Sequence, residues 1–311
     1  MTSRTRSLRL FSLVIVAASI SAPAAHGQAP KQKPEESNRP LVKVLMTADN
    51  WQIPITYYPA TGGQDAPAVV LLHGRRGDRL VWDRSFAKRL QADGYAVVSV
   101  DLRTHGKSQN TVGDSVGTGS KLKPGDYQAM VAEDLRVVKG FLFDEHQKKH
   151  LNIRKTGFVA AEMSAPLALT FAVKDWLEPP YDDANFADDR TPRGQDIRAI
   201  VMISPEAKLP GVATARVIDQ VRDPDWEIAF LTIYGTNDTL DKGESKQLYN
   251  KLSLPAANRN RVYIKPYAVG LRGTALLDAD DDVQKQILGF LKIHLKELPD
   301  EWRDRQSPLT K

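Results

Sequence analysis

The 311-residue sequence contains no cysteine, which excludes disulfide bonds, thiolate metal sites and a cysteine nucleophile. Aromatic residues are scarce, at 7% of the chain, and there are only six histidines. No GxGxxG motif follows a predicted strand and no GxxxxGK[ST] motif occurs, so nucleotide binding has no support. Acidic residues gather in residues 182–189, but their spacing fits no EF-hand calcium loop. We therefore expect neither a cofactor nor a metal.

The sequence also lacks an apolar run long enough to span a bilayer, which takes about 20 residues. Its N-terminal apolar run covers residues 10–20, after Arg4, Arg6 and Arg9 and before a stretch of small residues. This three-part pattern predicts a secretory signal peptide over residues 1–27. We therefore expect export, to a periplasm or out of the cell, and no stable membrane insertion once the signal is removed.

The net charge of +5 does not indicate a nucleic-acid partner. Three of the basic residues fall within the predicted signal peptide, and the others form no basic stripe interleaved with aromatic side chains. We expect no nucleic acid to bind, and the sequence identifies no protein partner. Residues 28–40, rich in Pro, Gln and charge, predict a disordered linker, and residues 299–311 form a C-terminal tail.

Residues 41–298 alternate between apolar runs that predict strands and segments with helical spacing. The first two strands, at 41–47 and 52–58, are expected to form an antiparallel pair. The later strands are expected at residues 66–74, 95–103, 156–162, 197–205, 227–235 and 261–269. The pattern predicts an α/β fold with a mostly parallel central sheet of about eight strands and helices on both faces. The segment 206–225 is too short for a large cap domain.

Polar motifs lie where five of the predicted strands end. They are HGRRG (73–77), DLRTHGKS (101–108), AEMSA (161–165), GTND (235–238) and VGLRGTALL (269–277). Ligands of mostly parallel sheets bind beyond the carboxyl ends of the strands. These five segments are therefore expected to surround the functional site.

In this order and spacing, the motifs resemble those of the α/β-hydrolase fold, especially its small esterase and dienelactone-hydrolase-like members. The resemblance covers residues 42–298. HGRRG resembles the HGxxG oxyanion loop, DLRTHGKS resembles the DxRGHGxS segment with Thr104 where glycine is usual, and GTND resembles the loop that bears the acid. The resemblance implies a catalytic triad: a nucleophile on a strained strand-to-helix turn, a histidine base and an acid that orients the histidine.

The nucleophile position is expected to have small residues two positions away on each side. Ala161 and Ala165 meet this condition around Met163, which is therefore predicted to occupy the apex of the turn. A thioether has no proton to lose and cannot form an acyl-enzyme intermediate. The neighbouring Ser164 fits less well, because Glu162 is then one of its flanking residues.

The acid of the implied triad is present as Asp238, but the histidine is missing. The segment 269–277, where the resemblance places the histidine, contains none, and Leu271 or Arg272 stands at the matching point. Arginine stays protonated and cannot act as a general base near neutral pH. The triad-equivalent positions are thus predicted to be Met163, Asp238 and Arg272.

Two departures from the triad predict an exported protein of the α/β-hydrolase fold that lacks serine-hydrolase catalysis and binds a small-molecule ligand or a partner. One alternative is a weak or atypical carboxylic-ester hydrolase that uses Ser164 with His73 or His105. Another is a purely structural role in the cell envelope. The sequence therefore leaves open whether the chain is an enzyme.

The predicted ligand pocket comprises the residues at the strand ends. They are His73, Gly74, Arg75, Arg76, His105, Met163, Ser164, Asp238, Leu271 and Arg272. Because three of them are arginines, we expect a positively charged rim and an anionic ligand.

Overall fold

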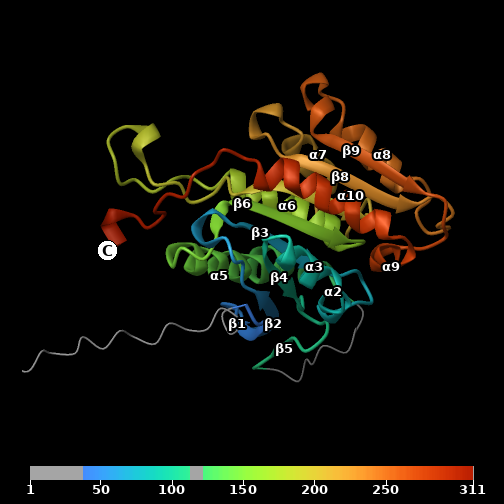
Figure 1. Cartoon of the computed structure of the whole chain (residues 1–311), viewed down its shortest axis with the longest axis horizontal. Helices are drawn as coiled ribbons and strands as arrows, with labels where there is room; N and C mark the ends of the chain where they lie inside the picture. Colours follow the sequence, from blue (N-terminus) through green and yellow to red (C-terminus); the bar gives the residue numbers. More distant parts are fainter. Residues whose placement is uncertain (1–37, 113–121, 311) are drawn as a thin grey trace, which may run out of the picture.

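The computed structural model describes residues 38–112 and 122–310 (Figure 1). The predicted signal peptide, and the predicted linker up to residue 37, lie outside the described residues. Within the described ranges, no helix combines the length and the apolar character needed to cross a membrane.

A mixed nine-stranded sheet runs through the molecule, with the order β1-β2-β4-β3-β6-β7-β8-β9, while the short β5 pairs with β2. The strands are β1 (Leu41–Met46), β2 (Trp51–Tyr58), β3 (Pro67–Leu72), β4 (Ala96–Val100), β5 (Gln109–Asn110), β6 (Asn152–Ala161), β7 (Ile197–Ile203), β8 (Ala229–Gly235) and β9 (Val262–Tyr267). β1 and β2 are antiparallel, and β2 is antiparallel to β4. The strands from β4 to β9 are parallel along the sheet path.

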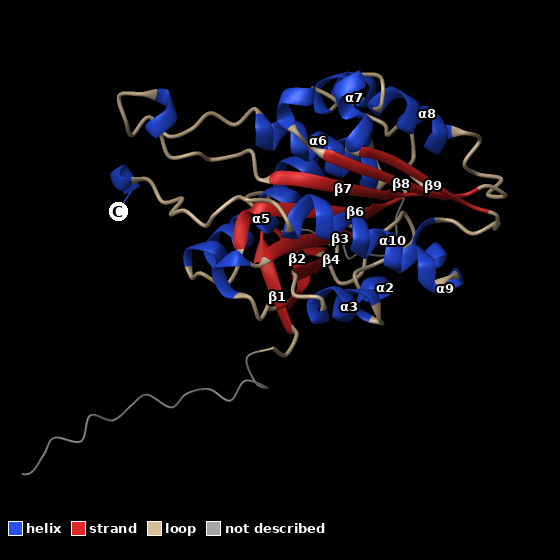
Figure 2. Cartoon of the chain, turned by 45° about the horizontal axis from the view of Figure 1, so that its top comes forward, coloured by secondary structure: helices blue, strands red, loops and turns tan. Residues whose placement is uncertain are grey.

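Helices cover both faces of this sheet, as Figure 2 shows. One face packs against α4 (Pro124–Ala129), α5 (Leu135–Gln147), α6 (Ser164–Trp176), α7 (Thr214–Val221) and α8 (Glu244–Leu252). The other packs against α2 (Leu80–Asp83), α3 (Phe86–Ala92), α9 (Leu276–Ala279) and α10 (Asp281–Leu291). The predicted α/β fold class, with its antiparallel first pair and without a large cap domain, is confirmed.

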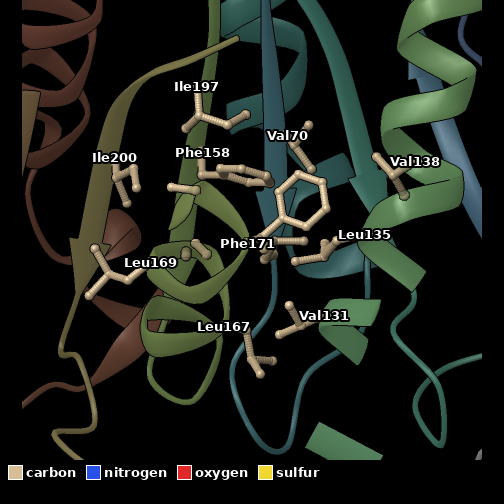
Figure 3. Packing of buried hydrophobic residues seen from close by; sticks show 14 of the residues in the cluster. Val70, Val131, Leu135, Val138, Phe158, Leu167, Leu169, Phe171, Ile197 and Ile200 are labelled. Carbon is tan, nitrogen blue, oxygen red and sulfur yellow. The ribbon is translucent and has the colours of Figure 1, made fainter. Parts of the chain in front are cut away.

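The central strands form because nearly every residue in them is apolar and is buried on one face or the other. All six residues of β3 are buried, as expected for a strand covered on both faces. Figure 3 shows Phe158 of β6 beside Phe171 of α6, whose rings meet edge to face with centroids 6.0 Å apart. Val70 and Leu135 belong to the same cluster and join β3, β6 and the helices into one core.

The C-terminal tail packs along the amino ends of β6 and β7, opposite the predicted site. The Asn152 side chain at the start of β6 donates a hydrogen bond to the carbonyl of Asp300 at 2.9 Å. Arg305 is 2% exposed and forms an ion pair with Asp196, the residue before β7, at 2.6 Å. In Figure 1 the tail, in red, runs on the same side as the long loop that follows α6.

Candidate functional site

The turn between β6 and α6 has its strained residue at Glu162, with a φ of 50°. Positive φ is uncommon outside glycine and marks the sharp strand-to-helix turn that presents a nucleophile in hydrolases. Met163 has a φ of −59° and caps α6. The apex of the turn is therefore Glu162. The prediction from the sequence that Met163 occupies the apex is wrong.

The misplacement has a physical reason. Ala160 and Ser164 lie two residues before and after Glu162, so the small-flank condition is met at this position as well as at Met163. With small residues at consecutive positions, the condition fits two registers that differ by one residue. The side chain of Met163 is fully buried in the apolar core beneath α6 and fills space there.

The carboxylate of Glu162 lies between the loop after β3 and the loop after β9. The backbone N–H of Arg75 donates a hydrogen bond to Glu162 Oε2 at 3.3 Å. A Cβ atom on Gly74 would stand 2.7 Å from Glu162 Cδ, and a Cβ on Gly273 would overlap Glu162 Oε1. A side chain at either glycine would push the Glu162 carboxylate aside, and Gly273 also has a φ of 55°, which favours glycine.

Two of the arginines predicted to form a positive rim are neutralised by acids. Arg75 donates to both carboxylate oxygens of Glu206, at 3.1 and 2.5 Å, and to the hydroxyl of Tyr127 at 2.5 Å. These hydrogen bonds, first of all those to Glu206, raise the pKa of Arg75. Arg272 donates to Asp238 Oδ2 at 2.8 Å. Because each of these two arginines is paired with a carboxylate, they do not provide the positively charged rim that was expected.

The Asp238–Arg272 pair stands where the resemblance places the acid and the histidine. Asp238 is 9% exposed and follows β8, while Arg272 lies in the loop after β9. An acid in this geometry would orient an imidazole in a working triad. Here it holds a guanidinium, which cannot accept a proton. Leu271 is 39% exposed beside this pair, and Arg76 is exposed on the loop after β3.

Ser164 is the first residue of α6 and is fully buried. Its hydroxyl donates a hydrogen bond to the carbonyl oxygen of His73 at 2.6 Å. This bond ties the start of α6 to the end of β3. The hydroxyl therefore points into the protein.

The two histidines of the predicted pocket are engaged with the backbone. His73 Nδ1 donates to the carbonyl of Gly74 at 2.8 Å, and its Nε2 accepts the N–H of Leu102 at 3.2 Å. Full burial, helped by the neighbouring His105, lowers the pKa of His73 from 6.5 to about 3. Both ring nitrogens of His105 face backbone carbonyls, those of Arg103 at 2.9 Å and Arg75 at 3.0 Å.

The ring centroids of His73 and His105 lie 4.7 Å apart, so the two imidazoles pack the loop after β3 against the loop after β4. Within the described ranges, no group of three or more His, Asp or Glu side chains could hold a metal ion.

Three residues of the site, Glu162, Glu206 and Gly273, were not predicted from the sequence. A charged residue directly after an apolar strand, with small residues two positions away, was the available signal for Glu162.

Comparisons with known proteins bear on the family and the fold of this chain. The sequence profile described as the Alpha/beta hydrolase family matches residues 69–309. No curated protein matches the sequence. An esterase of Pyrococcus furiosus has a similar structure, with a TM-score of 0.57 and 17% identity over 85% of this chain and 94% of that one.

A dienelactone hydrolase from Anabaena variabilis has a TM-score of 0.56 and 16% identity, over 83% of this chain and 99% of that one. A hyperthermophilic esterase from Pyrobaculum calidifontis has a TM-score of 0.54 and 18% identity, over 82% of this chain and 83% of that one. At such identities, the structural likeness indicates the fold alone. The family profile, however, covers most of the chain, and the chain therefore belongs to the alpha/beta hydrolase family.

Proposed function

We propose that this protein is an exported member of the family that lacks serine-hydrolase catalysis and acts by binding a ligand or partner. The observation that carries the proposal is the carboxylate of Glu162 at the apex of the turn. In serine hydrolysis, an apex hydroxyl attacks a carbonyl carbon while an imidazole takes the hydroxyl proton. Glu162 supplies a carboxylate and Arg272 a guanidinium, so both partners of that proton transfer are replaced.

The position of the Glu162 carboxylate gives a second argument. Its Oε2 accepts the backbone N–H of Arg75, in the loop that resembles the oxyanion loop. In a working hydrolase, such N–H groups stabilise the negative charge that develops on the substrate oxygen. A resident carboxylate uses this donor and repels a second negative charge. Glu162 therefore opposes the transition state of ester hydrolysis.

The alternative hydrolase, with Ser164 as nucleophile, finds little support in the contacts of its parts. The Ser164 hydroxyl is buried and bonded to the carbonyl of His73. His73 has both ring nitrogens occupied and a pKa lowered to about 3 by burial. Neither histidine offers a free nitrogen to the serine.

The export part of the proposal rests on the sequence pattern of residues 1–27, and mass spectrometry of the mature N-terminus would test it.

Rebuilding the triad tests the loss of catalysis. Wild type, Glu162→Ser, Arg272→His and the double variant would be assayed with p-nitrophenyl acetate. We expect wild type and both single variants to stay near the uncatalysed rate. The double variant regains the nucleophile and the base, and general base catalysis alone contributes about 100-fold or more. Adding Asp238→Asn to the double variant should reduce the gain.

The proposal would be wrong if wild type hydrolysed the ester at a rate well above background and Ser164→Ala abolished this rate. It would also be wrong if Glu162→Ala abolished it, because the carboxylate would then be the catalytic group. An active serine esterase, assayed in parallel, serves as the positive control. Circular dichroism of each variant checks that the fold is retained.

A further inference from the structure

A groove of about 500 Å³ lies between α7, α8 and the loop that follows β7. Figure 2 shows the two helices side by side on one face of the sheet. Small-molecule sites in proteins have volumes of about 300–1,000 Å³. We call this feature the α7–α8 groove, and it lies outside the set of residues predicted from the strand-end motifs.

The floor of the α7–α8 groove is apolar. Leu209 comes from the loop after β7, Ile218 from α7 and Leu248 from α8, and each of them is buried. Val212 is half-buried and also lines the groove. The floor therefore offers a surface on which an aliphatic chain can be removed from water.

The rim of the groove is basic. Lys208, Arg216 and Lys251 line it, and all three are exposed. Among residues 38–112 and 122–310, none of these three cations has an acidic partner within ion-pair distance, and the groove lining contains no Asp or Glu. This contrasts with the strand-end site, where Arg75 and Arg272 are both paired with acids.

The acids of the two helices do not line the groove, and both have partners. Asp219 of α7 pairs with Arg222 at 2.8 Å. Glu244 of α8 accepts the backbone N–H of Ala207, a residue of the groove lining, at 3.0 Å, so this carboxylate lies at the edge of the groove. The first turn of α7, which also lines the groove, follows Ala213, which has no side chain that could cap its N–H groups, although the Thr214 N–H donates to the carbonyl of Val212 at 2.9 Å. These N–H groups add to the positive potential at this end of the groove.

We propose that the α7–α8 groove binds an amphiphilic anion, an aliphatic chain with a carboxylate or similar head. The chain would lie on the apolar floor, and the head would face Lys208, Arg216 and Lys251. The loop of the groove continues from Glu206, which holds Arg75, so an occupant would lie close to the strand-end site. The inference rests on the binding role proposed above and names a ligand class for it.

Isothermal titration calorimetry with decanoate, below its micelle concentration, tests this inference. We expect binding of decanoate, much weaker binding of decanol and no detectable binding of butanoate. From octanoate to decanoate, the affinity should rise about fourfold for each added methylene, as expected from the transfer of apolar surface out of water. Decyl sulfate in place of decanoate shows whether the head group must be a carboxylate.

The double variant Arg216→Gln and Lys251→Gln should weaken decanoate binding about tenfold or more and leave decanol unaffected. Lys246→Gln is the matched control, because Lys246 is an exposed lysine of α8 that does not line the groove. Absence of decanoate binding to wild type overturns the inference. Binding that the control variant weakens as much as the double variant also overturns it, since any lysine would then serve. Ester hydrolysis reports on the strand-end site alone, so the two proposals can fail separately.

Discussion

Because His73 is buried and neutral in the folded protein, we expect the free energy of unfolding to decrease as the pH falls, by an amount that can be calculated. The side chain is fully buried and bonded on both nitrogens to the backbone of neighbouring loops. Burial, with a smaller contribution from His105, lowers its pKa from 6.5 to about 3. In the unfolded chain the same imidazole titrates at its ordinary value. The perturbation to compare with wild type is His73→Gln, because glutamine does not titrate in this range but can still donate and accept hydrogen bonds.

The sign and size follow from the two pKa values. As the pH falls below 6.5, the unfolded chain gains a proton that the folded His73 cannot take until about pH 3. Unfolding is therefore favoured progressively over this window, at about 1.4 kcal/mol per pH unit. Between pH 7 and pH 5, the contribution of His73 to the loss of stability is about 2 kcal/mol. Above pH 7 the contribution vanishes.

Urea unfolding at pH 7, 6 and 5, followed by tryptophan fluorescence, measures this difference. We expect His73→Gln to lower the free energy of unfolding at pH 7 through lost packing, and to lose about 2 kcal/mol less than wild type between pH 7 and pH 5. The packing loss is common to all pH values and cancels in the comparison. Equal losses in the two proteins would refute the reasoning that His73 is held neutral in the fold.

Three further substitutions test contacts of the site and of the tail by urea unfolding. Gly273→Ala should destabilise the protein by about 2 kcal/mol or more, because Gly273 has a left-handed φ and an added Cβ would overlap Glu162. Part of this effect should disappear in a Glu162→Ala background. An equal effect in both backgrounds would argue against the contact with Glu162. Ser164→Ala should destabilise by about 1–3 kcal/mol, because a buried carbonyl loses its donor, and a negligible change would mean that water replaces the hydroxyl. Arg305→Ala should destabilise by about 3–5 kcal/mol, because it leaves buried Asp196 without its main partner, and retention of full stability would show that the tail is not anchored there.

The sequence predicted the fold well because the strands are almost continuous apolar runs. A run such as that of β3 can only be buried on both faces, which requires a parallel sheet with helices on either side. The same information predicted that the motifs after the strands meet at one edge. The ion pair of Asp238 and Arg272 joins the ends of two strands that neighbour each other in the sheet, β8 and β9.

The register of the turn could not be predicted because backbone dihedral angles, and not composition, define its apex. Residues 160, 161, 164 and 165 are all small, so only the positive φ of Glu162 selects the position. The ion-pair partners of the arginines could not be predicted from the sequence either, because residues such as Arg75 and Glu206 lie far apart along the chain. For the same reason, nothing in the polar tail indicated that Arg305 is buried against Asp196.

Intact-mass analysis after treatment with a fluorophosphonate tests the central claim most directly. The reagent forms a stable adduct with an activated serine, and an active serine esterase is the positive control. The account predicts that wild type acquires no adduct under conditions that label this esterase. A stoichiometric adduct on wild type, lost in Ser164→Ala, would contradict it and would make this protein an active hydrolase.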